Sequence, residues 1–125
     1  MNVQRTVLEA KDICKSFYGN LVLNHVNFSC LTGEIHTLIG ENGAGKSTLM
    51  RIFSGVFSQS SGEVLINGQT VCFENTLQAQ KAGISIIHQE FNLVSHLSIA
   101  ENIFLGRPEK KKNGNIDFEK MRART

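Results

Sequence analysis

The feature that most constrains the fold is a glycine-rich segment from Gly40 to Ser47, which reads Gly-Glu-Asn-Gly-Ala-Gly-Lys-Ser. It fits the pattern G-x-x-x-x-G-K-[ST] without a mismatch, and this pattern joins a β-strand to a helix in proteins that bind phosphate groups. The context agrees. The segment 34–39 before the loop ends in apolar residues, and the apolar residues after it recur at helical spacing, at Leu49, Ile52, Phe53 and Val56. The sequence therefore predicts a strand, a loop and a helix over residues 34–56, and an α/β fold of the P-loop NTPase class.

The residue types of this loop explain how it would hold phosphate. The three glycines let the backbone turn tightly and point successive N–H groups inward, and the helix that starts near Lys46 directs its N-terminal donors to the same place. Lys46 adds a positive charge, Ser47 offers a hydroxyl to Mg²⁺, and Thr48 can bond a further phosphate oxygen. The predicted nucleotide-binding residues are Gly40, Glu41, Asn42, Gly43, Ala44, Gly45, Lys46, Ser47 and Thr48. A glycine-rich turn with a surface lysine is the alternative, and the motif alone does not choose among ATPases, GTPases and kinases.

Antiparallel strands are predicted around this loop. Val26, Phe28 and Cys30 alternate with polar residues, which is typical of a half-buried strand, and residues 7–13 show a weaker pattern of the same kind within an antiparallel region of about 5–35. Asn67-Gly68 separates two apolar runs and predicts a hairpin over 62–73. Residues 84–87, Ile-Ser-Ile-Ile, predict a buried strand that ends at His88.

Three helices are predicted from their capping residues. Residues 76–82 form the first, capped by Asn75 or Thr76, with Gly83 as its stop. Ser98 and Glu101 make a capping box for a helix through about residue 105. Asp117 caps a final helix.

Composition excludes several other classes of protein. Lys+Arg 13 against Asp+Glu 11 leaves a net charge of +2 without a basic stripe, so nucleic acid is not expected as a partner. No apolar run approaches the roughly 20 residues that a membrane helix needs. The start of the chain has no continuous apolar stretch of the kind that a secretory signal requires. The three cysteines, Cys14, Cys30 and Cys72, are therefore expected to be reduced core thiols of a cytosolic protein.

Three segments carry a family resemblance. Residues 34–49 closely resemble the Walker A segment of ABC transporter ATP-binding subunits, and residues 61–68 resemble the hairpin that follows it there. Residues 88–106, which contain His-Gln-Glu-Phe-Asn-Leu and Ala-Glu-Asn-Ile-Phe-Leu-Gly, resemble the Q-loop and the segment after it. The sequence of the third segment is most similar to that of the monosaccharide importers of the ribose, galactose, xylose and allose type. The resemblance covers nearly all of the chain and implies the ABC ATPase type of P-loop fold, with an N-terminal antiparallel β subdomain.

The resemblance also implies roles for single residues. Phe17 falls where the family places the aromatic ring that stacks on adenine; Tyr18 is the local competitor for this role, and a core phenylalanine is the alternative. Gln89 matches the Q-loop glutamine, whose amide contacts Mg²⁺ or the attacking water and senses the membrane partner. Lys46 and Gln89 are thus the expected catalytic residues, and Ser47 and Gln89 the expected Mg²⁺ ligands.

The implied function is the ATP-binding, energy-coupling component of a sugar importer, with ATP and Mg²⁺ as cofactors. Its expected partners are transmembrane permease subunits, a second ATP-binding domain on the same or another chain and, indirectly, a periplasmic sugar-binding protein. The expected location is the cytoplasm, peripheral on the inner face of the cell membrane.

Other parts that the resemblance requires are not found after Gln89. The sequence shows no Leu-Ser-Gly-Gly-Gln-like signature, no apolar run ending in Asp-Glu, and no switch histidine. We therefore expect residues 1–125 to be a partial ATP-binding domain, with the Q-loop and following helices at 84–125, able at most to bind nucleotide. The apolar strand at 35–39 would then lack a neighbour and expose its edge. An inactive truncated remnant and a non-transport P-loop ATPase are the alternatives.

Overall fold

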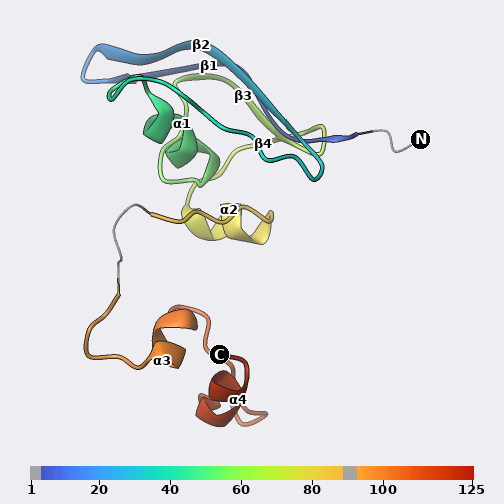
Figure 1. Ribbon diagram of the computed structural model, residues 1–125, viewed down its shortest axis with the longest axis vertical. Coiled ribbons are helices and arrows are strands. Elements are labelled where there is room, and N and C mark those ends of the chain that lie inside the picture. Colours follow the sequence, from blue (N-terminus) through green and yellow to red (C-terminus); the bar gives the residue numbers. More distant parts are fainter. Residues whose placement is uncertain (1–3, 89–92) are drawn as a thin grey trace. The chain divides into compact units, whose positions relative to one another are not determined.

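The computed structural model describes residues 4–88 and 93–125, which fall into two compact units, Met1–Ile86 and Ile87–Thr125. In the first unit, four antiparallel strands form one sheet in the order β2-β1-β3-β4 (Figure 1). The strands are β1 (Thr6–Phe17), β2 (Asn20–Leu31), β3 (Ser61–Ile66) and β4 (Gln69–Val71). The central position of β1 follows from its two partners, because β2 pairs with one edge of β1 and β3 with the other.

The predicted hairpin and the predicted antiparallel strands before it are both present. β1 and β2 are longer than the alternating patterns indicated, and only two residues, Tyr18 and Gly19, separate them. The turn between β3 and β4 is Asn67-Gly68, with φ of 51° and 80°. Two consecutive positive φ angles are what a two-residue type I′ turn requires, so the Asn-Gly prediction is confirmed.

Helix α1 (Lys46–Phe53) supplies three of the seven residues of the buried core cluster of this unit. It lies against one face of the sheet (Figure 1) and buries Leu49, Ile52 and Phe53, three of the four residues whose spacing predicted a helix. The fourth, Val56, lies after the end of α1 and is 42% exposed, so the helix is shorter than predicted. The sheet contributes Ala10, Ile13, Leu23 and Val64 to the same cluster. The short helix α2 (Thr76–Lys81) follows β4, and the side chain of Asn75 caps it by accepting a hydrogen bond from the Gln78 backbone N–H at 3.0 Å.

Two predicted strands are not formed. Residues 34–39 and 84–87 have no regular secondary structure and belong to no strand. A buried strand of a parallel sheet needs backbone partners on both sides, and within residues 4–88 and 93–125 no strand pairs with either segment. Several of their apolar side chains are open to solvent: Ile35 is 97% exposed, Ile39 91% and Ile87 98%, whereas Ile84 is half-buried against the core. The expected exposure of residues 35–39 is thus confirmed, but their strand conformation is not.

Over residues 93–125, the second unit contains two short helices, α3 (Ile99–Ile103) and α4 (Phe118–Ala123). The capping box is confirmed, because the Glu101 N–H donates to Ser98 Oγ at 3.3 Å and the Ser98 N–H donates to Glu101 Oε2 at 2.9 Å. Asp117 caps α4 through the Lys120 N–H at 3.0 Å, also as predicted. Helix α3 ends at Ile103, two residues before its predicted end.

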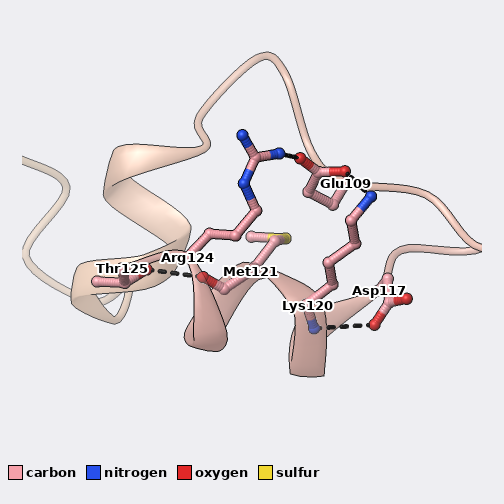
Figure 2. A network of polar contacts seen from close by, with 6 residues as sticks. All are labelled: Glu109, Asp117, Lys120, Met121, Arg124 and Thr125. Atoms are coloured by element: carbon pink, nitrogen blue, oxygen red, sulfur yellow. Dashed lines mark hydrogen bonds and ion pairs between the residues drawn. The ribbon is translucent and has the colours of Figure 1, made fainter.

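Glu109 connects α4 to the loop that precedes it. Figure 2 shows its carboxylate between the side chains of Lys120 and Arg124; the Lys120 ammonium lies at 2.8 Å and the Arg124 guanidinium also donates to it. The Asp117 N–H donates to the Glu109 carbonyl at 2.8 Å, and Met121 is buried beneath. Because both cations are more than half exposed, these pairs contribute less than about 1 kcal/mol each and mainly fix the geometry of the loop.

Two further expectations concern membrane-spanning helices and the burial of the cysteines. Among the helices of the described ranges, none is long and apolar enough to cross a membrane. All three cysteines are free thiols, but Cys14 and Cys30 are only half-buried and Cys72 is exposed, so the prediction that all three are core residues is wrong. Cys72 lies just after the end of β4, where the chain leaves the sheet.

Candidate nucleotide-binding site

The glycine-rich loop has the backbone that its sequence predicts. Gly43 and Gly45 take φ of 87° and 91°, a region that residues with a Cβ rarely adopt. Gly45 is buried and is the N-cap of α1. A Cβ on Gly45 would lie 2.6 Å from the Leu23 side chain and 3.1 Å from the Val22 carbonyl oxygen of β2. The loop can therefore press against the sheet only because residue 45 has no side chain.

Lys46 lies inside the curve of this loop. Its ammonium donates to the carbonyl oxygens of Gly40 at 2.5 Å and Glu41 at 2.7 Å. The Ala44 N–H donates to the Glu41 carbonyl at 3.1 Å and closes the turn around it. A positive charge is thus held at the mouth of the loop, as a phosphate site requires.

The start of α1 adds donors beside that charge. Among the described residues, no side chain caps α1 at Gly45, and no acidic residue lies in its first turn. The first N–H groups of a helix lack partners within the helix and carry about half a positive charge. Ser47 is exposed and Thr48 half-buried in this turn. Backbone donors, two hydroxyls and one ammonium therefore come together, and this donor set is suited to an anion such as a phosphate chain.

The end of the β1–β2 hairpin lies beside the loop. Lys15 of β1 pairs with Leu23 of β2, and the Leu23 side chain is the one that meets Gly45. Phe17 is two residues further along β1, opposite Asn20. Its ring is half-buried and makes an edge contact with the ring of Phe57, with centroids 5.1 Å apart and an interplanar angle of 70°. Of the two aromatic candidates, Phe17 has a fixed ring, whereas Tyr18 occupies the turn at φ 50° with its side chain fully exposed.

The carboxylate of Glu34 fixes the chain where it leaves β2 toward the loop. Glu34 Oε2 accepts from the Leu31 N–H at 2.6 Å, and Oε1 lies 3.3 Å from His36 Nδ1. The Leu31 N–H, and then the contact with His36, hold the pKa of Glu34 below its ordinary value. The pKa of the neighbouring Cys30 thiol is raised, first by burial and then by the charge of Glu34. A raised pKa lowers the fraction of thiolate, which makes Cys30 a weaker nucleophile than an ordinary thiol.

The remaining site predictions concern Mg²⁺. Gln89 lies outside the residues that the structure describes. Within the described part of the chain, no group of three or more His, Cys, Asp or Glu side chains could hold a metal ion. The hydroxyl of Ser47 at the start of α1 is an oxygen donor of the kind that Mg²⁺ accepts, and Mg²⁺ usually completes its shell with water and phosphate oxygens. The donor set thus fits a cation that arrives together with a nucleotide.

Two residues at the site were not predicted from sequence. Lys15 and Phe57 both contact Phe17. The alternation of side chains along β1 places residues 15 and 17 on the same face, so Lys15 could have been found from its spacing. Phe57 follows α1 in an irregular segment, and no local pattern indicates that it meets β1.

The fold and the loop together define a P-loop nucleotide-binding protein. A family model described as ABC transporter matches residues 23–125. The chain therefore belongs to the ABC transporter family.

Two solved ATP-binding cassettes from ABC transporters support this fold. The first, a nucleotide-free cassette, superposes with a TM-score of 0.75 and is 22% identical in sequence; the match covers 96% of this chain and 46% of that cassette. The other has a TM-score of 0.73 at 26% identity over 81% and 40%.

Curated relatives are more similar in sequence. A putative ribose/galactose/methyl galactoside import ATP-binding protein of Burkholderia cenocepacia is 47% identical over 95% of this chain and 23% of its own length. The ribose import ATP-binding protein RbsA of Geobacillus kaustophilus is 44% identical over 92% and 24%. The xylose import ATP-binding protein XylG of Thermoanaerobacter pseudethanolicus is 47% identical over 95% and 24%. The chain thus spans about a quarter of the length of these relatives.

Proposed function

We propose that this chain binds MgATP through residues 40–48 and belongs to the energy-coupling component of an ABC-type sugar importer. The observation that carries the proposal is the Lys46 ammonium, held within the loop at the uncapped start of α1. The names of the relatives support ATP as the nucleotide and a monosaccharide as the transported substrate.

Each group of the loop would have its own task. Phosphate oxygens would take the loop N–H groups and the ammonium of Lys46, which then exchanges its bonds to the Gly40 and Glu41 carbonyls for bonds to the ligand. The Ser47 hydroxyl would hold Mg²⁺, and Thr48 would bond a phosphate oxygen. When bound, Mg²⁺ neutralises charge that develops on the phosphates. Gln89 is proposed as a second Mg²⁺ or water contact on the strength of the family resemblance alone.

The base would stack on Phe17. Its ring is half-buried, and its strand is held beside the phosphate loop through the contact of Leu23 with Gly45. An aromatic ring recognises a purine by stacking on its flat surface, and this stacking requires no charged group.

A permease is the proposed membrane partner. The second unit has an apolar hollow of about 360 Å³, in which Leu93 and Ile99 are 68% and 75% exposed. It is lined by Leu93, Val94, Ser95, Leu97, Ile99, Asn102 and Ile103. Asn102 braces one wall, because its side chain accepts from the Val94 N–H and donates to the Val94, Leu97 and Ser98 carbonyls. An apolar surface of this kind suits a helix of a membrane subunit at the cytoplasmic face.

ATP hydrolysis is proposed for the whole protein and not for these residues by themselves. The relatives are about four times as long as the part that matches, so groups beyond it can supply the base and the metal carboxylate. Two ATP-binding domains and a sugar-binding protein complete the proposed assembly.

The test is Lys46→Ala in the full-length protein that contains this chain. We expect MgATP affinity in calorimetry to fall at least about tenfold, because one charged contact to phosphate is lost, and ATP-driven sugar uptake to stop. Lys11→Met, at an exposed position of β1, is the matched control and should change neither. Unchanged ATP binding would refute the nucleotide site, while lost binding with unchanged uptake would indicate a non-transport ATPase.

A further inference from the structure

Phe17 is part of a cluster of aromatic and cationic side chains from two segments of the chain. The Lys15 ammonium lies over the Phe17 ring at 5.0 Å from its centroid and over the Phe57 ring at 5.8 Å. The two rings meet edge to face. The Arg51 guanidinium lies 5.8 Å from the Phe57 centroid. A candidate base-stacking ring is thus contacted by one cation and one aromatic edge.

Hydrogen bonds keep this cluster in place. The Lys15 ammonium donates to the Ser58 carbonyl at 2.6 Å, and the Ser16 N–H donates to Ser60 Oγ at 3.2 Å. The Phe57 N–H donates to the Arg51 carbonyl at 3.2 Å, which ties Phe57 to the end of α1. Because α1 starts at the phosphate loop, the ring that meets Phe17 and the loop that would hold phosphate are attached to the same helix.

We propose that Lys15 and Phe57 are positioning residues that orient Phe17 for a purine base. This rests on the nucleotide function proposed above. Phe57 limits rotation of the Phe17 ring by its edge contact. Lys15 places a positive charge over the π-system, which draws electron density from the ring and favours stacking with an electron-rich purine. Neither residue belongs to the loop at 40–48 that would hold the phosphates, so both would act on the base alone.

A purely structural role makes a different prediction. If Lys15 and Phe57 only joined β1 to the segment after α1, their loss would weaken the whole site, including the phosphate loop. If they orient Phe17, their loss weakens the binding of ligands that carry a base and spares ligands that do not. Tripolyphosphate with Mg²⁺ is such a baseless ligand.

The experiment compares the affinities of the full-length protein for MgATP and for magnesium tripolyphosphate by calorimetry. We expect Lys15→Met to weaken MgATP binding about two- to fivefold, by loss of a cation over a ring, and to leave tripolyphosphate binding unchanged. Lys15→Arg should restore the affinity, since it keeps the charge over the ring. Lys11→Met is the matched control on the same strand and should change neither affinity.

Two more variants complete the test. Phe57→Leu should weaken MgATP binding about two- to tenfold with tripolyphosphate unaffected. In a Phe17→Ala background, Lys15→Met should have no further effect on MgATP. Equal losses for both ligands, or no loss for MgATP in Lys15→Met, would overturn the positioning role. If the unsubstituted protein does not bind MgATP, or binds it regardless of Lys46→Ala, the proposed function fails instead.

Discussion

At the scale of single residues, Gly45 joins the sheet to the phosphate loop. Its φ of 91° excludes a strain-free side chain, and the Leu23 side chain occupies the place where a Cβ would be. Gly43, in the same loop, has nearly the same φ of 87° but no atom within 4 Å of a Cβ. Alanine substitutions at the two positions therefore distinguish the free-energy cost of backbone strain, which both have, from the cost of a steric clash, which only Gly45 has.

We expect Gly45→Ala to be more destabilising than Gly43→Ala in urea unfolding of the full-length protein. Both lose about 1–2 kcal/mol of unfolding free energy from the left-handed backbone, and only Gly45→Ala must also displace Leu23. The double variant Gly45→Ala/Leu23→Ala should recover MgATP affinity lost in Gly45→Ala. Equal effects of the two single variants would show that the contact with β2 is unimportant.

Residue roles were only partly predictable. The loop residues followed from a motif whose members are adjacent in the chain, so their spacing alone placed them together. Phe57 could not be found in this way, since its contact with Phe17 spans 40 positions of sequence and depends on how α1 crosses the sheet.

At the scale of elements, local signals were reliable and non-local ones were not. The Asn67-Gly68 turn and the caps of α2, α3 and α4 formed as expected because their hydrogen bonds close within a few residues. The segments 34–39 and 84–87 have strand-like composition, but a strand exists only when another pairs with it. The register of β1 against β3 likewise depends on partners that lie 47 to 58 positions apart in the sequence.

The capping box of α3 should be sensitive to pH. Hydrogen bonds from Ser98, first from its side chain and then from its backbone, hold the pKa of Glu101 below its ordinary value. A lowered pKa in the folded state means that the ionised carboxylate stabilises α3. This contribution is complete above the unfolded pKa of about 4.3 and is lost as the pH falls through the folded value.

We expect Ser98→Ala to raise the pKa of Glu101 toward its ordinary value, as measured by NMR titration of the side-chain carboxyl. In the unsubstituted protein, the Ser98 amide resonance should follow the same titration, because that N–H donates to Glu101 Oε2. Ser95→Ala, a nearby exposed serine without a capping role, serves as the control. A Glu101 titration that Ser98→Ala leaves unchanged would contradict the capping account.

At the scale of the whole molecule, the most unusual feature is the apolar segment at 35–39. Ile35, Leu38 and Ile39 are 97%, 38% and 91% exposed, and the backbone of the segment is free of strand pairing within the described residues. Exposed β-branched residues with unpaired backbone groups can add to a strand edge of another molecule.

The 125-residue chain by itself should therefore be marginally stable and should self-associate. We expect sedimentation velocity to show species larger than the monomer at micromolar concentration, and Ile35→Lys/Ile39→Lys to shift them toward the monomer by charge repulsion. Leu77→Lys, at a 57% exposed position on α2, is the control and should not. A soluble monomer with a sharp two-state thermal transition would contradict this prediction.

The contact of Leu23 with Gly45 also couples the conformation of the phosphate loop (residues 40–47) to that of the sheet. A ligand that binds only the native conformation of the loop also stabilises the native β1–β2 hairpin, because the loop takes its shape only against β2. Binding of the phosphates should therefore also protect the backbone amides of β2. Amide hydrogen exchange along β2 should therefore slow when nucleotide is added. Strand β2 would then report whether the loop is occupied, although β2 itself does not belong to the nucleotide site.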